Sequence, residues 1–180
     1  MSTNIKIQKI THKLPTLKWY ALYTNPRAEK KVANELDIRG FENYLPLQTT
    51  FKKWSDRKKK VEIPLFNSYI FVRIEIEKNY YNILEIPGIV KFVKFGKEIS
   101  AMRDEQIDQI KLLLSNFDDI EVNSELIGIN ELVEVIAGPL RGFKGLTIEN
   151  QSNKTFAIEI EQLGCFMKIN LPKQYLKKVH

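Results

Sequence analysis

The chain has 180 residues, of which 43% are hydrophobic and 28% charged, and its net charge is +6. This composition is too apolar for a disordered protein, and no segment approaches the roughly 20 apolar residues of a membrane-spanning helix. The N-terminal residues contain no apolar run that ends in a small-residue cleavage site. We therefore expect a cytoplasmic globular protein that does not contact membranes and is long enough for two small domains.

Residues that could perform catalysis are scarce. Cys165 is the one cysteine, and the two histidines, His12 and His180, lie near the ends of the sequence. A disulfide within the chain is impossible, and these residues cannot assemble a zinc site. Cys165 falls in a predicted strand, where a packed thiol is expected rather than a nucleophile. The glycines of residues 138–145 lack the Gly-Lys-Ser/Thr ending of a phosphate loop. The sequence predicts no enzyme activity, cofactor or bound metal.

The charge is unevenly distributed. Residues 1–116 carry 21 basic and 13 acidic residues, a net charge of +8, whereas residues 117–127 carry four acids and no base. Residues 128–180 have a net charge of +2. The basic first part favours a nucleic-acid or acidic protein partner, and the acidic interval is typical of a solvated linker. The opposite charges of this linker and residues 52–60 also permit a contact between domains.

The first part of the chain alternates between strand and helix patterns. Residues 17–24 are rich in aromatic and aliphatic residues, as strands are, and Asn25-Pro26 and Gly40 delimit a predicted helix at 26–39. The further predicted elements are an extended segment at 41–51, a second arm at 61–76, a helix at 78–86, a strand at 89–95 and a helix at 103–115. This order predicts an α+β domain of the ferredoxin-like kind, an antiparallel sheet with helices against it.

The second arm contains the clearest alternation. Ile70, Val72, Ile74 and Ile76 share one face that can pack on helices, and Tyr69, Phe71, Arg73 and Glu75 share the other. Tyr23 joins the aromatic residues if the register of its strand allows it. Two interpretations remain open. The aromatic residues either cover a second layer of the domain or form an apolar docking patch.

Beyond the acidic interval only short strands are predicted, separated by turn residues. They span 131–136, 145–149, 155–161, 165–171 and 176–179. Five short strands in about fifty residues indicate a small SH3-like β-barrel. The predicted organisation is an N-terminal extension at 1–16, a first domain at 17–116, a linker at 117–127 and a barrel at 128–180.

A dense basic segment lies between the arms of the predicted hairpin. Residues 52–60 contain six bases, one acid and Trp54. Lysine and arginine contact phosphates, and an aromatic ring among them can stack on an unpaired base. We interpret this segment as a nucleic-acid contact, the alternative being a solvated hairpin tip.

Several motifs together resemble those of the NusG-type transcription factors. Those of the first domain are WYALY at 19–23, NPRAEKKV at 25–32, PLFNSYIFV at 64–72 and IPGIV at 86–90. The segment VEVIAGPLRGFKG at 133–145 is similar to the KOW motif that opens the C-terminal barrel of these factors. The resemblance implies a ferredoxin-like NGN domain followed by an SH3-like KOW barrel. Residues 48–72, with the basic hairpin, look most like the specialised RfaH-like and UpxY-like paralogues that antiterminate particular operons.

The resemblance also implies sites and partners. The first domain is expected to bind the clamp helices of the largest subunit of RNA polymerase, with Tyr23, Phe66, Tyr69, Phe71 and Phe95. DNA or nascent RNA of the elongation complex would meet Lys30, Lys31, Lys52, Lys53, Trp54, Arg57, Lys58, Lys59 and Lys60. The barrel would recruit a ribosomal protein or the termination factor Rho through Leu140, Phe143 and Leu163. A monomer is expected.

Two alternatives and one departure accompany this resemblance. The chain could be a housekeeping NusG, or a ribosome- or RNA-associated protein, because KOW barrels also occur in ribosomal proteins. The aromatic face of the first domain argues against the ribosomal alternative. Where many relatives have Pro-Gly or Pro-Ser, this sequence has Asn67-Ser68, which is expected to loosen the bend that holds Phe66.

Overall fold

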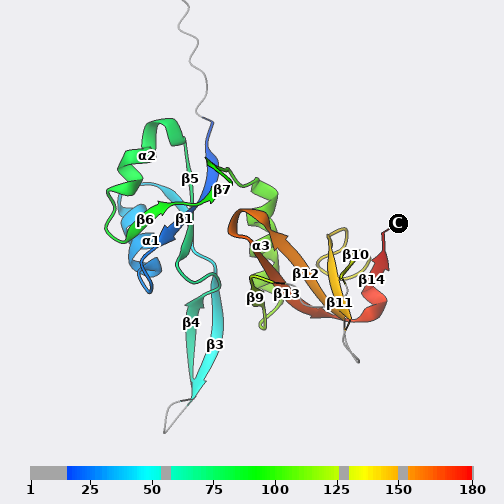
Figure 1. Ribbon diagram of the computed structural model, residues 1–180. Helices are drawn as coiled ribbons and strands as arrows, with labels where there is room; N and C mark the ends of the chain where they lie inside the picture. The colour runs from blue at the N-terminus through cyan, green and yellow to red at the C-terminus, as the bar shows by residue number, and fades with distance from the viewer. Residues whose placement is uncertain (1–15, 54–57, 126–129, 150–153, 180) are drawn as a thin grey trace, which may run out of the picture.

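The computed structural model describes residues 16–53, 58–125, 130–149 and 154–179, with the backbone alone for 51–53, 58–59, 130, 148–149 and 154. The chain folds into two domains that lie against each other (Figure 1). None of the helices within these residues has the length and hydrophobicity needed to cross a bilayer.

The first domain is built on a four-stranded antiparallel sheet. β1 (Lys18–Thr24) pairs with β5 (Tyr69–Ile74) on one side and with β6 (Ile89–Phe92) on the other. β2 (Glu42–Tyr44) pairs with the outer side of β5. The resulting order, β2-β5-β1-β6, is that of the ferredoxin-like arrangement, so the predicted α+β fold class is confirmed.

Helices α1 (Glu29–Ile38) and α2 (Ile76–Leu84) share one hydrophobic core with one face of this sheet. The aliphatic residues that alternate along β5, Ile70, Val72 and Ile74, all point into that core and are fully or almost fully buried. The predicted assignment of the aliphatic face to the helices is therefore confirmed for these three residues, whereas Ile76, the fourth residue of the predicted face, is the first residue of α2.

Helix α1 begins three residues later than predicted. Asn25 to Ala28 form a turn in which the Ala28 N–H donates to the Asn25 carbonyl oxygen at 3.1 Å. Arg27 has a φ of 65°, which a helical residue cannot adopt. The C-terminus agrees with the prediction: Gly40, at φ 75°, ends the helix, and the Phe41 N–H donates to the Leu36 carbonyl at 2.9 Å.

The extended segment predicted at 41–51 is interrupted at Pro46. β2 ends at Tyr44, and β3 (Leu47–Lys53) starts a separate hairpin with β4 (Lys58–Pro64). Proline has no N–H to donate to a neighbouring strand, so it marks the point where pairing changes. Figure 1 shows the hairpin extending away from the sheet.

The opposite face of the sheet packs against helix α3 (Asp104–Asn116), whose Ile107, Ile110 and Leu113 are buried. A small ribbon of β7 (Lys94–Phe95) and β8 (Glu98–Ile99) connects β6 to this helix. Trp19 of β1 pairs with Met102 just before α3 and fixes where the helix starts.

The second domain is a six-stranded antiparallel sheet in the order β14-β10-β11-β12-β13-β9. Its strands are β9 (Glu121–Asn123), β10 (Asn130–Val135), β11 (Lys144–Glu149), β12 (Lys154–Ile160), β13 (Cys165–Leu171) and β14 (Leu176–Lys178). Two 3-10 helices, η1 (Glu161–Leu163) and η2 (Lys173–Tyr175), join them. The acidic interval 117–127 differs from a plain linker, because its residues 121–123 form β9 on the edge of β13.

Gly145 at the start of β11 is required by the packing of the barrel. A Cβ atom there would lie 2.5 Å from the Ala157 carbonyl oxygen and 2.7 Å from the ring of Phe156. Phe156 is fully buried, so its ring cannot move aside without opening the core.

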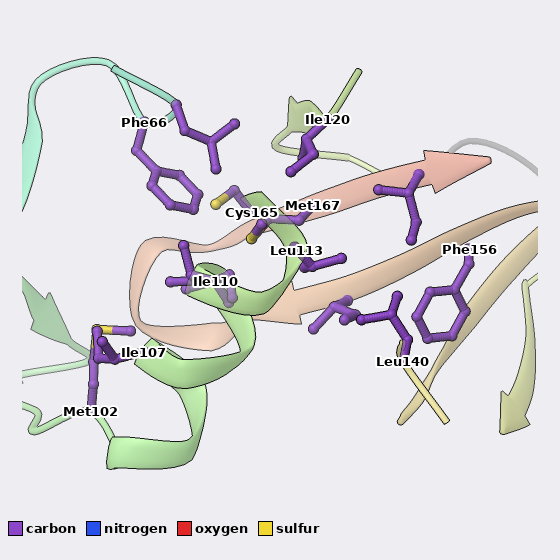
Figure 2. Packing of buried hydrophobic residues seen from close by; sticks show 14 of the residues in the cluster. Phe66, Met102, Ile107, Ile110, Leu113, Ile120, Leu140, Phe156, Cys165 and Met167 are labelled. Atoms are coloured by element: carbon purple, nitrogen blue, oxygen red, sulfur yellow. The ribbon is translucent and has the colours of Figure 1, made fainter. Parts of the chain in front are cut away.

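The two domains share a single hydrophobic cluster. Phe66 of the first domain, Ile110 and Leu113 of α3, and Cys165 and Met167 of the barrel pack together in it (Figure 2). A hydrogen bond crosses the same interface, from the buried Gln106 side-chain amide of α3 to the side-chain oxygen of Gln162 in η1, at 3.1 Å. Among the residues whose side chains the structure describes, the contact between domains is thus mainly apolar.

Candidate functional site

Three neighbouring strands place polar aromatic side chains in a row across the sheet. Tyr23 of β1 lies opposite Tyr69 of β5, with the ring centres 5.3 Å apart and the rings nearly perpendicular. On its other side Tyr23 lies opposite Lys91 of β6, whose Nζ is 5.6 Å from the centre of the Tyr23 ring. We call Tyr69, Tyr23 and Lys91 the rim row.

Deeper on the same face the aromatic residues are covered. Phe71 is fully buried, Phe66 is 3% exposed, and their rings meet edge to face at 5.9 Å. Tyr44 stacks against Phe71, and burial raises the pKa of the Tyr44 phenol to about 12. Trp19 is also buried, and Lys111 of α3 lies over both its ring and that of Tyr44. We call Trp19, Tyr44, Phe66 and Phe71 the inner aromatic residues.

The predicted polymerase-binding residues therefore fall into two groups. The structure brings Tyr23, Phe66, Tyr69 and Phe71 onto one face; alternation predicted this for Tyr69 and Phe71, and the resemblance implied it for Tyr23 and Phe66. Phe66 and Phe71 lie under α3 and the barrel, whereas Tyr23 and Tyr69 are half-buried. Phe95 lies on β7, beside η1 of the barrel, and is 60% exposed. Both interpretations of the aromatic face hold in part, because it covers a second layer and still reaches the surface at its rim.

The bend that carries Phe66 is firmly held. Ser68 adopts φ 66°, its N–H donates to the carboxylate of Glu29 at 2.7 Å, and its carbonyl accepts from the Thr24 N–H at 2.8 Å. Glu29 is buried at the first turn of α1, where the helix dipole favours a negative charge. The expected loosening by Asn67-Ser68 is not found. Sequence reasoning missed Glu29, because only the fold brings it to this bend.

Cys165 lies where the barrel meets the first domain. Its side chain is 8% exposed, and burial raises the pKa of its thiol to about 11. The pKa of Tyr69 is also raised, first by burial and then by the nearby Tyr23 and Cys165. The expectation of a packed, unreactive thiol is confirmed.

The candidate nucleic-acid residues lie on α1 and the β3–β4 hairpin. Lys31 and Lys60 are exposed, as is Lys30, whose Nζ donates to the Glu62 carbonyl of β4 at 2.9 Å and so ties α1 to the hairpin. The register of the hairpin pairs Lys52 with Lys59 and Lys53 with Lys58. Trp54 and Arg57 lie outside the described residues.

The candidate partner residues of the barrel are less accessible than expected. Leu140 is 1% exposed and belongs to the core beside Phe156 (Figure 2), so in this arrangement it supports the barrel and presents nothing to a partner. Phe143 is half-buried and lines an open groove of about 690 Å³ between α3 and the β10–β11 turn. Leu163 is half-buried in η1, within the cluster shared by the two domains.

A pocket that the sequence did not reveal lies beside the rim row. Its volume is about 220 Å³, and its lining residues are Tyr23, Tyr69, Lys91, Phe92, Val93 and Lys94. Alternation along 89–95 separates Lys91 from Phe92, but only the observed register shows that Lys91 meets Tyr23. Lys91 and Lys94 are therefore functional candidates in addition to the predicted set.

An antiparallel sheet with an aromatic face is joined to a small β-barrel, an architecture that by itself does not define a function. The family described as transcription termination factor nusG matches residues 17–111, more than half of the chain. The chain belongs to the NusG family of transcription factors, whose members bind RNA polymerase and are not enzymes.

Individual relatives extend this likeness over both domains. The transcription termination/antitermination protein NusG of Rickettsia prowazekii is 27% identical, covering 95% of this chain and 97% of that protein. The NusG protein of Rickettsia felis is 25% identical over 89% of each chain. The solved structure titled "Domain interaction in Thermotoga maritima NusG" shares the fold, with a TM-score of 0.56 and 22% identity, covering 91% of this chain and 98% of that one.

Proposed function

We propose that this NusG-type factor binds the clamp helices of the largest RNA polymerase subunit through its aromatic sheet face and promotes read-through of pauses and terminators at particular operons. The observation that carries the proposal is the aromatic face formed by β1, β5 and the bend at Phe66, in which Tyr23 and Tyr69 are half-buried at the rim and Phe66 and Phe71 are buried. A factor that bridges the cleft and prefers the closed clamp shifts the polymerase away from the paused state by the difference in its affinities.

Full engagement of this face requires the barrel to move. Phe66 becomes accessible only when Cys165 and its neighbours separate from it. The apparent affinity for polymerase is then the intrinsic affinity reduced by the fraction of molecules that are open. Weakening the contact between domains should therefore increase activity, as long as the barrel itself stays folded.

The hairpin supports a nucleic-acid contact within the elongation complex. The register of the hairpin places Lys52 opposite Lys59 and Lys53 opposite Lys58, so the basic residues of 52–60 are concentrated in one short hairpin. The phosphates of upstream or non-template DNA, or of emerging RNA, are partners of the complementary charge. Once released, the barrel would present Phe143 and Leu163 to a ribosomal protein or to Rho.

Single-round transcription with the cognate polymerase, on templates with pauses and a terminator, tests the proposal. Tyr69→Ala and Phe95→Ala should reduce read-through, because both residues are accessible on the proposed face. Tyr81→Ala is the matched control, because Tyr81 is 76% exposed on α2, which packs on the opposite face of the sheet.

The outcomes separate the alternatives. Loss of read-through in Tyr69→Ala and Phe95→Ala but not in Tyr81→Ala supports the proposal. Equal activity on all templates indicates a housekeeping role, and activity restricted to particular leader regions indicates a specialised factor. No polymerase binding, together with retained RNA binding, would replace the proposal with a ribosome- or RNA-associated role.

A further inference from the structure

The closed arrangement of the two domains leaves one part of the aromatic face open. The inner aromatic residues are covered, but the rim row borders solvent, and the pocket beside it is formed although the barrel is in place. A partner can therefore reach the rim row without any movement of the barrel.

The rim is basic as well as aromatic. Lys91 and Lys94 are exposed and line the pocket, and Lys97 follows in the β7–β8 turn, with Glu98 as the acid of this segment. An apolar side chain comes from Val93, which is half-buried and packs on the cluster shared by the two domains, whereas the Phe92 ring packs on Tyr80 on the other face of the sheet. A site of this kind fits a carboxylate next to an apolar side chain.

We propose that the rim pocket, formed by Tyr23, Tyr69, Lys91 and Lys94, is the first docking point for an acidic protein segment of the polymerase while the barrel still covers Phe66 (Figure 2). This inference rests on the proposed function and adds the chemistry and order of binding. The exposed ring of Phe95, on the adjacent β7, supplies an apolar anchor next to the two lysines.

The geometry favours a carboxylate over a nucleotide. Stacking of a base requires an open aromatic face. The Tyr23 ring is not open, because the Lys91 ammonium lies over it and the Tyr69 ring packs against it nearly at a right angle. The tyrosine hydroxyls and lysine ammonium groups can all donate hydrogen bonds, which is the complement of a carboxylate.

Docking at the rim also favours removal of the barrel. β7, which carries Lys94, lies against η1, which carries Glu161 and Leu163 of the barrel. A partner that settles on Lys94 and Phe95 occupies space next to η1 and competes with the barrel for the adjacent surface. The rim pocket thus couples first contact to exposure of Phe66.

Association kinetics of the full-length chain with the cognate core polymerase, free of nucleic acid, tests this order. The double variant Lys91→Glu, Lys94→Glu should associate about tenfold or more slowly at low salt, with a smaller change in dissociation rate, since charges at an accessible edge mainly steer encounter. The difference should shrink as salt is added. Lys97→Glu is the control, because it carries the same reversal in the same segment outside the pocket.

The results are distinguishable from failure of the proposed function. An association rate of the double variant within twofold of wild type, while wild type binds, overturns the rim proposal and leaves polymerase binding intact. The same is true if the double variant loses affinity for a single-stranded oligonucleotide but not for core polymerase, because the pocket then serves nucleic acid. No binding by the wild-type chain overturns both proposals.

Discussion

The hydrogen bond between Gln106 and Gln162 offers a way to open the contact between domains without touching either hydrophobic surface. In the closed chain the Gln106 amide is buried and donates to Gln162 at 3.1 Å, while the Gln106 side-chain oxygen accepts from the Arg103 N–H at 3.0 Å. Gln162→Ala removes the acceptor and keeps the contact with Arg103. A buried donor left without a partner costs about 1–2 kcal/mol.

This cost falls on the closed state alone, because water satisfies Gln106 once the domains separate. Since a tenfold change in an equilibrium constant corresponds to about 1.4 kcal/mol, the opening constant should rise about 5- to 30-fold. The same substitution should raise read-through activity where opening limits polymerase binding.

Thiol labelling of Cys165 provides the assay. The thiol lies at the interface, and its pKa of about 11 in the closed chain compares with 9.0 for a free thiol. Reactive thiolate at pH 8 is therefore roughly a hundredfold scarcer in the closed form, in addition to the steric protection. When opening and closing are fast relative to labelling, the labelling rate follows the open population.

Gln174→Ala is the matched control, because Gln174 is an exposed glutamine in the other 3-10 helix of the barrel. We expect the labelling rate to rise about 5- to 30-fold in Gln162→Ala and to stay within twofold of wild type in Gln174→Ala. Equal rates in all three proteins would refute the argument that this hydrogen bond holds the closed state. Wild-type labelling as fast as that of the urea-unfolded chain would show that the barrel is not docked in solution.

Three further predictions concern stability and can be measured by urea unfolding. Ser68→Gly should stabilise the first domain by about 1 kcal/mol, because glycine adopts φ 66° without the strain of a side chain and the backbone bonds remain; a loss of stability would mean that the serine hydroxyl contributes more than the strain costs. Gly145→Ala should destabilise the barrel by about 3 kcal/mol through collision with Ala157 and Phe156, and its effect should exceed that of Gly164→Ala, where there is open space and only φ 59° to oppose the new side chain. The folded chain holds the Cys165 proton more tightly than the unfolded chain, so the stability that the protonated thiol contributes is complete below pH 9 and is lost as the pH rises toward 11. The free energy of unfolding of wild type relative to Cys165→Ala should therefore fall by about 2 kcal/mol over that interval. A pH-independent difference would contradict the raised pKa.

Local patterns predicted the parts of the fold that depend on short-range periodicity. The alternation assigned the two faces of β5 correctly from Tyr69 to Ile74, because side chains of a strand point to opposite sides in turn, but its extension to Ile76 was wrong, since Ile76 begins α2. The predicted start of α1 was wrong, because Arg27 has a positive φ that ends the helical geometry. Arginine seldom adopts a positive φ, so the residue type gave no reason to expect it. Strand β9 was missed, because three residues in an acidic segment carry too little pattern.

The positions of the candidate site residues in the fold were partly predictable, but their accessibility was not. Tyr23 and Tyr69 were placed on one face from alternation and resemblance, and their pairing follows from the register. Phe66 is buried because α3 and the barrel pack over its face of the sheet. Leu140 is buried because the β10–β11 turn points its side chain into the barrel core. Such long-range packing leaves no local mark in the sequence, and neither does the meeting of Lys91 with Tyr23.

The connection between α3 and the barrel is short, since only residues 117–120 separate Asn116 from β9. A tether of this length keeps the barrel at an effective concentration on the order of millimolar near the face that it covers. For a partner that binds Phe66, the barrel therefore acts as a built-in competitor at each binding event. When such a partner dissociates, the barrel is already in place to cover Phe66 again, so each round of binding ends in the protected state without a second molecule.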